Sequence, residues 1–165
     1  INGNDEKGQN SLPYQLALSY ELDALTVAFA MDSNDSNLAY SSNVPGTSIN
    51  NENTYGLRAT YDMGDLSLTG EYHTRSDVGD SYGLMGNYSM GANTFALGYV
   101  MRDIDDVANS QSSGIALQAL HNVSDHMYVW SELYVVNQES DAVVGGAPAS
   151  DVDTNALVVG ATYYF

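Results

Sequence analysis

The stretch Tyr55-Gly56-Leu57-Arg58-Ala59-Thr60-Tyr61-Asp62-Met63 places an apolar side chain at every second position. Glycine and three polar residues, Arg58 and Asp62 among them, fill the positions between. A period of two is that of a β-strand, because successive side chains of a strand point to opposite faces. The stretch therefore predicts a strand with one apolar face and one polar face.

The same period of two recurs through most of the chain. It is clear in 14–21, 25–31 and 66–73. Further alternating segments predict strands at 81–90, 93–102, 113–123, 127–137 and 154–165. We therefore expect an all-β fold of nine strands, each about ten residues long.

The connections between these strands alternate in length. Short turns are expected at 22–24, 64–65, 91–92 and 124–126. Longer polar stretches separate them, at 33–52, 74–80, 103–112 and 138–153. This order predicts an antiparallel up-and-down sheet with tight turns at one end, the turn end, and long loops at the other, the loop end.

The composition excludes several classes of protein. The 165 residues fit one domain, and 4 Lys plus Arg against 21 Asp plus Glu give a net charge of −17. A nucleic-acid partner bound through a basic face is therefore excluded. The chain has no Cys, so it has no disulfide framework or thiolate metal site. No apolar run approaches the roughly 18 residues of a transmembrane helix.

The two registers of the strands differ in charge. The apolar register of the first six strands and of the last contains no Asp, Glu, Lys or Arg. The other register holds Glu21, Arg58, Asp62, Glu71 and Arg102. Strands of about ten residues match a membrane barrel wall, whose lipid face excludes charge. We expect the apolar register to face lipid and the polar register to face water.

Tyrosines support this orientation. On the apolar register, Tyr pairs spaced by six residues could reach both membrane interfaces, as an aromatic girdle requires. The predicted girdle comprises Tyr14, Tyr20, Tyr55, Tyr61, Tyr72, Tyr82, Tyr88 and Tyr99, with Phe95 and Phe165 at the turn end. The alternative is the core of a soluble β-sandwich, although such cores favour Val, Ile, Leu and Phe over Tyr.

The end of the chain resembles a known family. Its last strand runs from Leu157 to a terminal Phe165 with Tyr163 two residues before it, and is similar to the C-terminal strand of Gram-negative outer-membrane barrels. The two last strands, 127–138 and 154–165, resemble those of trimeric general diffusion porins. The segment 120–125 resembles the Tyr-Asn-Leu-Ser-Lys turn of these porins, with His121 and Asp125 as departures.

The resemblance implies a transmembrane β-barrel in the bacterial outer membrane. The nine strands would then be the last nine of a sixteen-stranded porin, the C-terminal half of a longer protein, with 1–12 as an extracellular loop and 13–165 as strands. A complete barrel of eight or ten strands is the rival. Either way, residues 1–165 form a single barrel domain.

The same resemblance implies passive diffusion of small hydrophilic solutes through a water-filled homotrimer, with no cofactor. Lipid, lipopolysaccharide and the barrel-assembly machinery are the implied partners, and Tyr163 and Phe165 the assembly signal. The alternative is a small barrel or a secreted β-domain that acts as an adhesin through its acidic loops.

The polar register supplies the candidate functional residues. We expect these to line the pore: Arg58, Thr60, Glu71, His73, Arg102, Gln118 and Glu132. Glu71 and His73 share a face, but no nucleophile accompanies them, so the protein is not expected to be an enzyme.

Two orientations of Trp130 remain open from the sequence. If Glu132 faces water, then Tyr128, Trp130 and Tyr134 line the lumen with it, where aromatic rings could stack on sugars. If a bulge interrupts that strand, Trp130 faces lipid instead. His121 is expected to face outward.

Acidic residues gather at the loop end. Fourteen of the acids fall there, against Lys7, Arg75 and Arg102, which predicts a preference for cations. Asp103, Asp105 and Asp106 are candidate oxygen ligands for Ca²⁺ or Mg²⁺. The glycine and the terminal Glu of an EF-hand loop are absent, so we expect no specific metal site.

Overall fold

The computed structural model describes residues 14–34, 52–105, 110–139, 143–144, 147–148 and 151–165. The predicted loop at 1–12 lies outside these residues, as do Lys7, Asp106 and most of 33–52. No described helix is long and apolar enough to cross a membrane.

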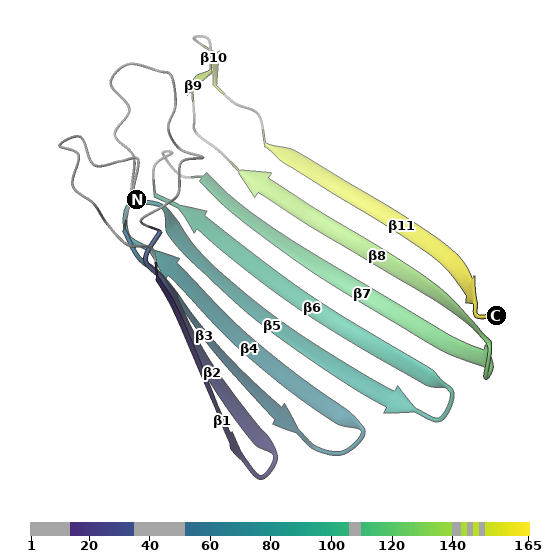
Figure 1. Ribbon diagram of the computed structural model, residues 1–165. Helices are drawn as coiled ribbons and strands as arrows, with labels where there is room; N and C mark the ends of the chain where they lie inside the picture. Colours follow the sequence, from purple (N-terminus) through teal and green to yellow (C-terminus); the bar gives the residue numbers. More distant parts are fainter. Residues whose placement is uncertain (1–13, 35–51, 106–109, 140–142, 145–146, 149–150) are drawn as a thin grey trace.

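Nine long strands form one antiparallel sheet in chain order (Figure 1). They are β1 (Gln15–Leu22), β2 (Leu25–Asp32), β3 (Thr54–Asp62), β4 (Leu66–Arg75), β5 (Gly79–Met90), β6 (Asn93–Ile104), β7 (Ser110–Ser124), β8 (Met127–Glu139) and β11 (Val152–Tyr163). Every strand pairs with the next long strand along the chain, so the predicted up-and-down order is confirmed. The sheet is open, with β1 and β11 at its two edges.

Most differences from the predicted strand bounds lie at the loop end. Strands β5, β6 and β7 extend two or three residues further toward it than expected. The predicted long loop at 74–80 is wrong, because Thr74 pairs with Asp80 and Arg75 with Gly79, which leaves a turn of three residues. The backbone of Gly79 has a φ of 138°, and a Cβ there would lie 2.0 Å from the carbonyl oxygen of Asp103. Only glycine fits this close approach.

A second difference lies within the predicted polar loop at 138–153. Two short strands, β9 (Val143–Val144) and β10 (Ala147–Pro148), pair there as a separate antiparallel sheet. With only two residues each, they are too short to show a period of two in the sequence.

The register assigns each side chain to one of two faces, because residues paired across antiparallel strands share a face. One face carries Arg58 with its successive partners Glu71, Gly83 and Val100, and we call it the Arg58 face. The opposite face carries Leu57, paired with Tyr72, and we call it the Leu57 face.

The described residues contain no buried hydrophobic core. Only Ser33, at 1% exposure, and Thr69, at 5%, are buried. Large apolar side chains stand exposed along the Leu57 face, including Leu18, Leu57, Leu84 and Val159. A soluble β-sandwich would cover such a face with a second sheet. None of the nine long strands forms a second sheet over this face.

Candidate functional site

All seven residues predicted to line the pore lie on the Arg58 face. Arg58 pairs with Glu71, and Gln118 pairs with Glu132. Thr60 belongs to the same register, and its hydroxyl lies 3.0 Å from that of Thr69. His73 and Arg102 lie on this face as well, because both are cross-strand partners of Ser81 on β5.

The charged groups on this face are close but loosely paired. His73 Nε2 lies 4.0 Å from Glu71 Oε2, the limit of an ion pair, and both side chains are about half exposed. Arg58 is the cross-strand partner of Glu71, yet their charged groups form no ion pair within 4.0 Å. Both signs of charge are therefore exposed on the same face of the sheet.

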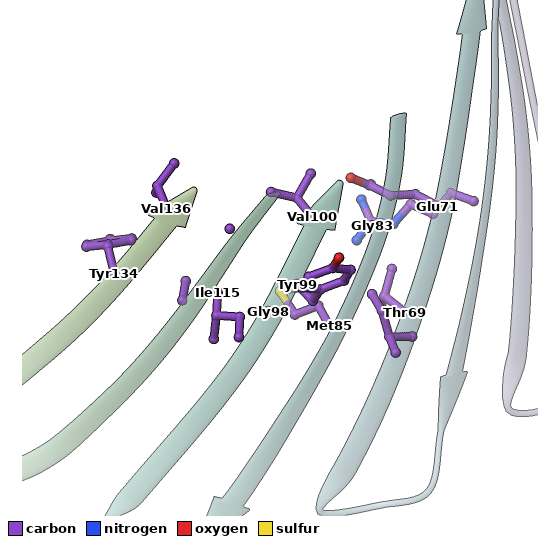
Figure 2. A pocket seen from close by; sticks show the side chains of 14 residues that line it. Thr69, Glu71, Gly83, Met85, Gly98, Tyr99, Val100, Ile115, Tyr134 and Val136 are labelled. Atoms are coloured by element: carbon purple, nitrogen blue, oxygen red, sulfur yellow. The ribbon is translucent and has the colours of Figure 1, made fainter. Parts of the chain in front are cut away.

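A hollow of about 400 Å³ lies against the Arg58 face of strands β3 to β8 (Figure 2). Arg58, Thr69 and Glu71 form its polar side, while Met85, Val100 and Val136 form an apolar side. Three glycines contribute to the wall: Gly83, Gly98 and Gly114. Glu71 leans over Gly83, where an added Cβ would lie 2.8 Å from its Oε1 atom.

Sequence reasoning missed this hollow. The glycines lie on different strands, at unrelated positions in the sequence, and the register alone brings Gly83 and Gly114 into one row with Val100 between them. The signal available in the sequence was the apolar and small residues on the otherwise polar register, at Met85, Gly98 and Val100.

A hydrogen-bonded group surrounds Glu132. The Gln118 amide donates to Oε1 at 3.1 Å, and the Tyr134 hydroxyl donates to Oε2 at 2.5 Å. Two donors thus hold the carboxylate in one orientation on the Arg58 face.

The register also decides between the two orientations of Trp130. The irregularity lies in β7, between Asn122 and Ser124, and the pairing of β8 with β11 is continuous. Trp130 therefore shares the Arg58 face with Glu132, and it packs against its partner Gly160. His121 lies on the Leu57 face as expected, with its Nδ1 2.8 Å from Asn93 Oδ1.

The eight tyrosines of the predicted girdle lie on the Leu57 face. Seven of them are 40% to 68% exposed, and Tyr72 is half-buried. The ring centroids of Tyr72 and Tyr82 lie 4.9 Å apart, and the Tyr72 hydroxyl donates a hydrogen bond to Asp80 Oδ1 at 2.9 Å. Seven of the rings are therefore exposed on the Leu57 face, and Tyr72 has a polar partner near the loop end, which suits a membrane interface.

Nine of the fourteen loop-end acids are described: Asp32, Glu52, Asp77, Asp80, Asp103, Asp105, Glu139, Asp151 and Asp153. Asp80 and Asp103 are direct cross-strand partners. In the part of the chain that the structure describes, no three His, Asp or Glu side chains are grouped so that they could hold a metal ion. Asp103 and Asp105 therefore gain no support as ligands, and Asp106 lies outside the described residues.

Comparisons with known proteins agree with this architecture. A family model described as Gram-negative porin matches residues 19–165. A sequence search finds no match among curated proteins.

Two solved structures resemble the chain in fold. The anion-selective porin from Comamonas acidovorans has a TM-score of 0.64 and 19% identity, and the match covers 90% of this chain and 48% of that porin. OmpT, an outer membrane protein of Vibrio cholerae that was folded in vitro, has a TM-score of 0.57 and 17% identity. The match covers 93% of this chain and 55% of OmpT. The chain thus spans about half the length of these proteins.

The alternating faces, the up-and-down sheet and the family match all indicate strands of a β-barrel in the bacterial outer membrane. An adhesin or a secreted β-domain is not favoured. The chain belongs to the Gram-negative porin family.

Proposed function

We propose that this chain forms part of the wall of a water-filled channel through which small hydrophilic solutes and ions diffuse passively. The observation that carries this proposal is the division of one sheet into an Arg58 face with charges along the strands and a Leu57 face with charges only at the loop end. In a membrane barrel the charged face lines the lumen and the apolar face contacts lipid. The seven residues of the predicted pore lining then meet water, and catalysis is not part of the function.

Further strands complete the barrel in this proposal. The described sheet has two unpaired edge strands, β1 and β11, and an open edge in a membrane leaves backbone groups without partners. The chain also spans about half of each similar porin, which leaves room for the additional strands.

The exposed apolar side of the last strand suits subunit packing. Leu157 and Val159 on β11 are among the most exposed apolar residues described. We expect them to contact lipid or a neighbouring subunit of a homotrimer. Lipopolysaccharide and the barrel-assembly machinery are the other partners that this function implies.

A preference for cations follows from the charges at the loop end. Nine described acids lie at the loop end, whereas the described cations at that end are Arg75 and Arg102. Their field draws cations to the pore mouth and repels anions. The similar porin from Comamonas acidovorans is anion-selective. We therefore expect the two proteins to differ in selectivity while sharing a fold.

The test is the zero-current potential of the complete protein in a planar bilayer under a KCl gradient. The Debye length is about 30 Å at 0.01 M and about 3 Å at 1 M, so loop charges act across the mouth only at low salt. We expect a cation-selective potential at low salt that weakens as the mean concentration rises. The variant Asp80→Asn/Asp103→Asn should lower it, because the two acids adjoin at the loop end.

An anion-selective potential at low salt would contradict the cation preference, while the channel itself would stand. No conductance in any salt would contradict the proposed function as a whole. As a control for nonspecific effects, the variant Ser81→Ala changes the same sheet row as His73 and Arg102 without altering charge.

A further inference from the structure

A second hollow, of about 300 Å³, lies on the Arg58 face toward the turn end of strands β5 to β8. Tyr128 and Trp130 supply aromatic rings to it, and Asn87, Gln118 and Glu132 supply polar groups. This volume is at the lower end of the range for small-molecule pockets. The hollow is separate from the one that Arg58 and Glu71 border.

Trp130 is held in place by a glycine on the neighbouring strand. Gly160 is its cross-strand partner, and a Cβ on Gly160 would lie 2.5 Å from Cζ2 and 2.6 Å from Cε2 of the indole. The ring thus occupies the space that a side chain on β11 would need. The ring packs against the backbone of β11 at Gly160, and the half-buried ring still borders the hollow.

The rim offers hydrogen-bonding groups of both kinds. Within the described ranges, the indole N–H of Trp130 and the side chains of Asn87 and Thr94 have no hydrogen-bond partner. Glu132 is oriented by Gln118 and Tyr134, and each of its oxygens retains capacity to accept another bond. A ligand that fits must therefore both accept and donate hydrogen bonds next to an aromatic ring.

We propose that this hollow is a binding subsite for one ring of a neutral carbohydrate. A pyranose ring has an apolar C–H face that can pack on an aromatic ring, and its edge carries hydroxyls that donate and accept. Trp130 and Tyr128 would contact the face, while Asn87, Thr94 and Glu132 would bind the hydroxyls. The inference rests on the proposed channel, of which it names a solute class.

A neutral sugar fits better than an organic cation. A cation would use the Trp130 ring face and the Glu132 carboxylate, but it would leave the donors of Trp130, Asn87 and Thr94 unused. The Glu132 carboxylate also already accepts two hydrogen bonds, which reduces the negative charge that a cation would meet.

The experiment measures block of the KCl current through the complete protein by maltotriose, and in a second arm by tetramethylammonium. We expect maltotriose to block the channel. Trp130→Ala should weaken this block at least about tenfold, equivalent to about 1.4 kcal/mol. Trp130→Phe should retain most of it, because a ring remains. Glu132→Gln should retain most of it too, since the amide still accepts a hydrogen bond.

The matched control is Val136→Ala, which shortens a side chain on the same strand and face but borders the other hollow. It should leave the block by maltotriose unchanged. Calorimetric titration of the detergent-solubilised protein with maltotriose gives a second readout that needs no current.

Each other outcome overturns the inference. If the channel conducts KCl but maltotriose neither blocks nor binds, the subsite is absent and the channel stands. Block by tetramethylammonium alone, abolished by Glu132→Gln, would make the hollow a cation site. Equal block by maltotriose in the wild type and in Trp130→Ala would show that Trp130 does not contribute to sugar binding. An absence of all conductance and of binding would overturn both proposals.

Discussion

Leu57→Arg should sharply reduce the amount of folded barrel in the outer membrane, whereas Thr60→Arg should assemble at close to the normal level. Leu57 is 50% exposed on the Leu57 face and lies near the middle of β3. Arginine at the centre of a lipid-facing strand costs about 2–4 kcal/mol. At position 60 the new charge would point toward the lumen, at the cost of one hydroxyl contact with Thr69.

The measurement is the fraction of protein that migrates as the folded form on a gel without heating, after isolation of outer membranes. Leu57→Ala is the matched control, because it shortens the same side chain without adding charge. Equal folded fractions for both arginine variants would show that the two faces are assigned wrongly.

Deletion of Phe165 should slow delivery to the outer membrane several-fold and leave refolding in detergent almost unchanged. The β8–β11 ladder ends at Tyr163, so Phe165 lies beyond it. Its side chain is fully exposed, at 115%, and its described ring contact is an edge-on one with Tyr163 at 5.5 Å. Losing one exposed ring removes little packing from the sheet, while an assembly signal read by other proteins would be lost.

Pulse-chase labelling with fractionation of membranes measures the delivery, and gel migration after dilution into detergent measures the refolding. Tyr164→Ala is the control, because it removes an adjacent ring that contacts Tyr128 and leaves Phe165 in place. Normal surface levels of the truncated protein would refute the assignment of Phe165 as an assembly signal.

The strand order was predictable because each strand carries its own period of two. Residues 55–63, for example, alternate without a break, and β3 is observed at Thr54–Asp62. The same period predicted the face of each pore-lining candidate. Arg58 and Leu57, for example, are adjacent in β3 and therefore point to opposite faces of the sheet. Local information of this kind is sufficient for an up-and-down sheet, in which neighbours in sequence are neighbours in space.

Features that depend on the pairing of distant residues could not be predicted in the same way. Gly79, which follows the turn at 76–78, lies against the backbone of Asp103, a residue on another strand. The orientation of Trp130 depended on which strand carried the bulge, and its contact with Gly160 depended on the register of β8 with β11. The hollow that Arg58 and Glu71 border likewise depends on the register of β5, β6 and β7, which brings Gly83, Val100 and Gly114 into one row.

The central claim is that the Arg58 face of the sheet meets water and the Leu57 face meets lipid. Cysteine scanning of 55–61 tests it directly, because the chain contains no cysteine of its own. Each variant of the complete protein is placed in lipid vesicles and treated on both sides with a charged, water-soluble maleimide. We predict rapid labelling at positions 56, 58 and 60 and protection at 57 and 59. Uniform labelling, or rapid labelling at 57 and 59 with protection at 58, would contradict the account.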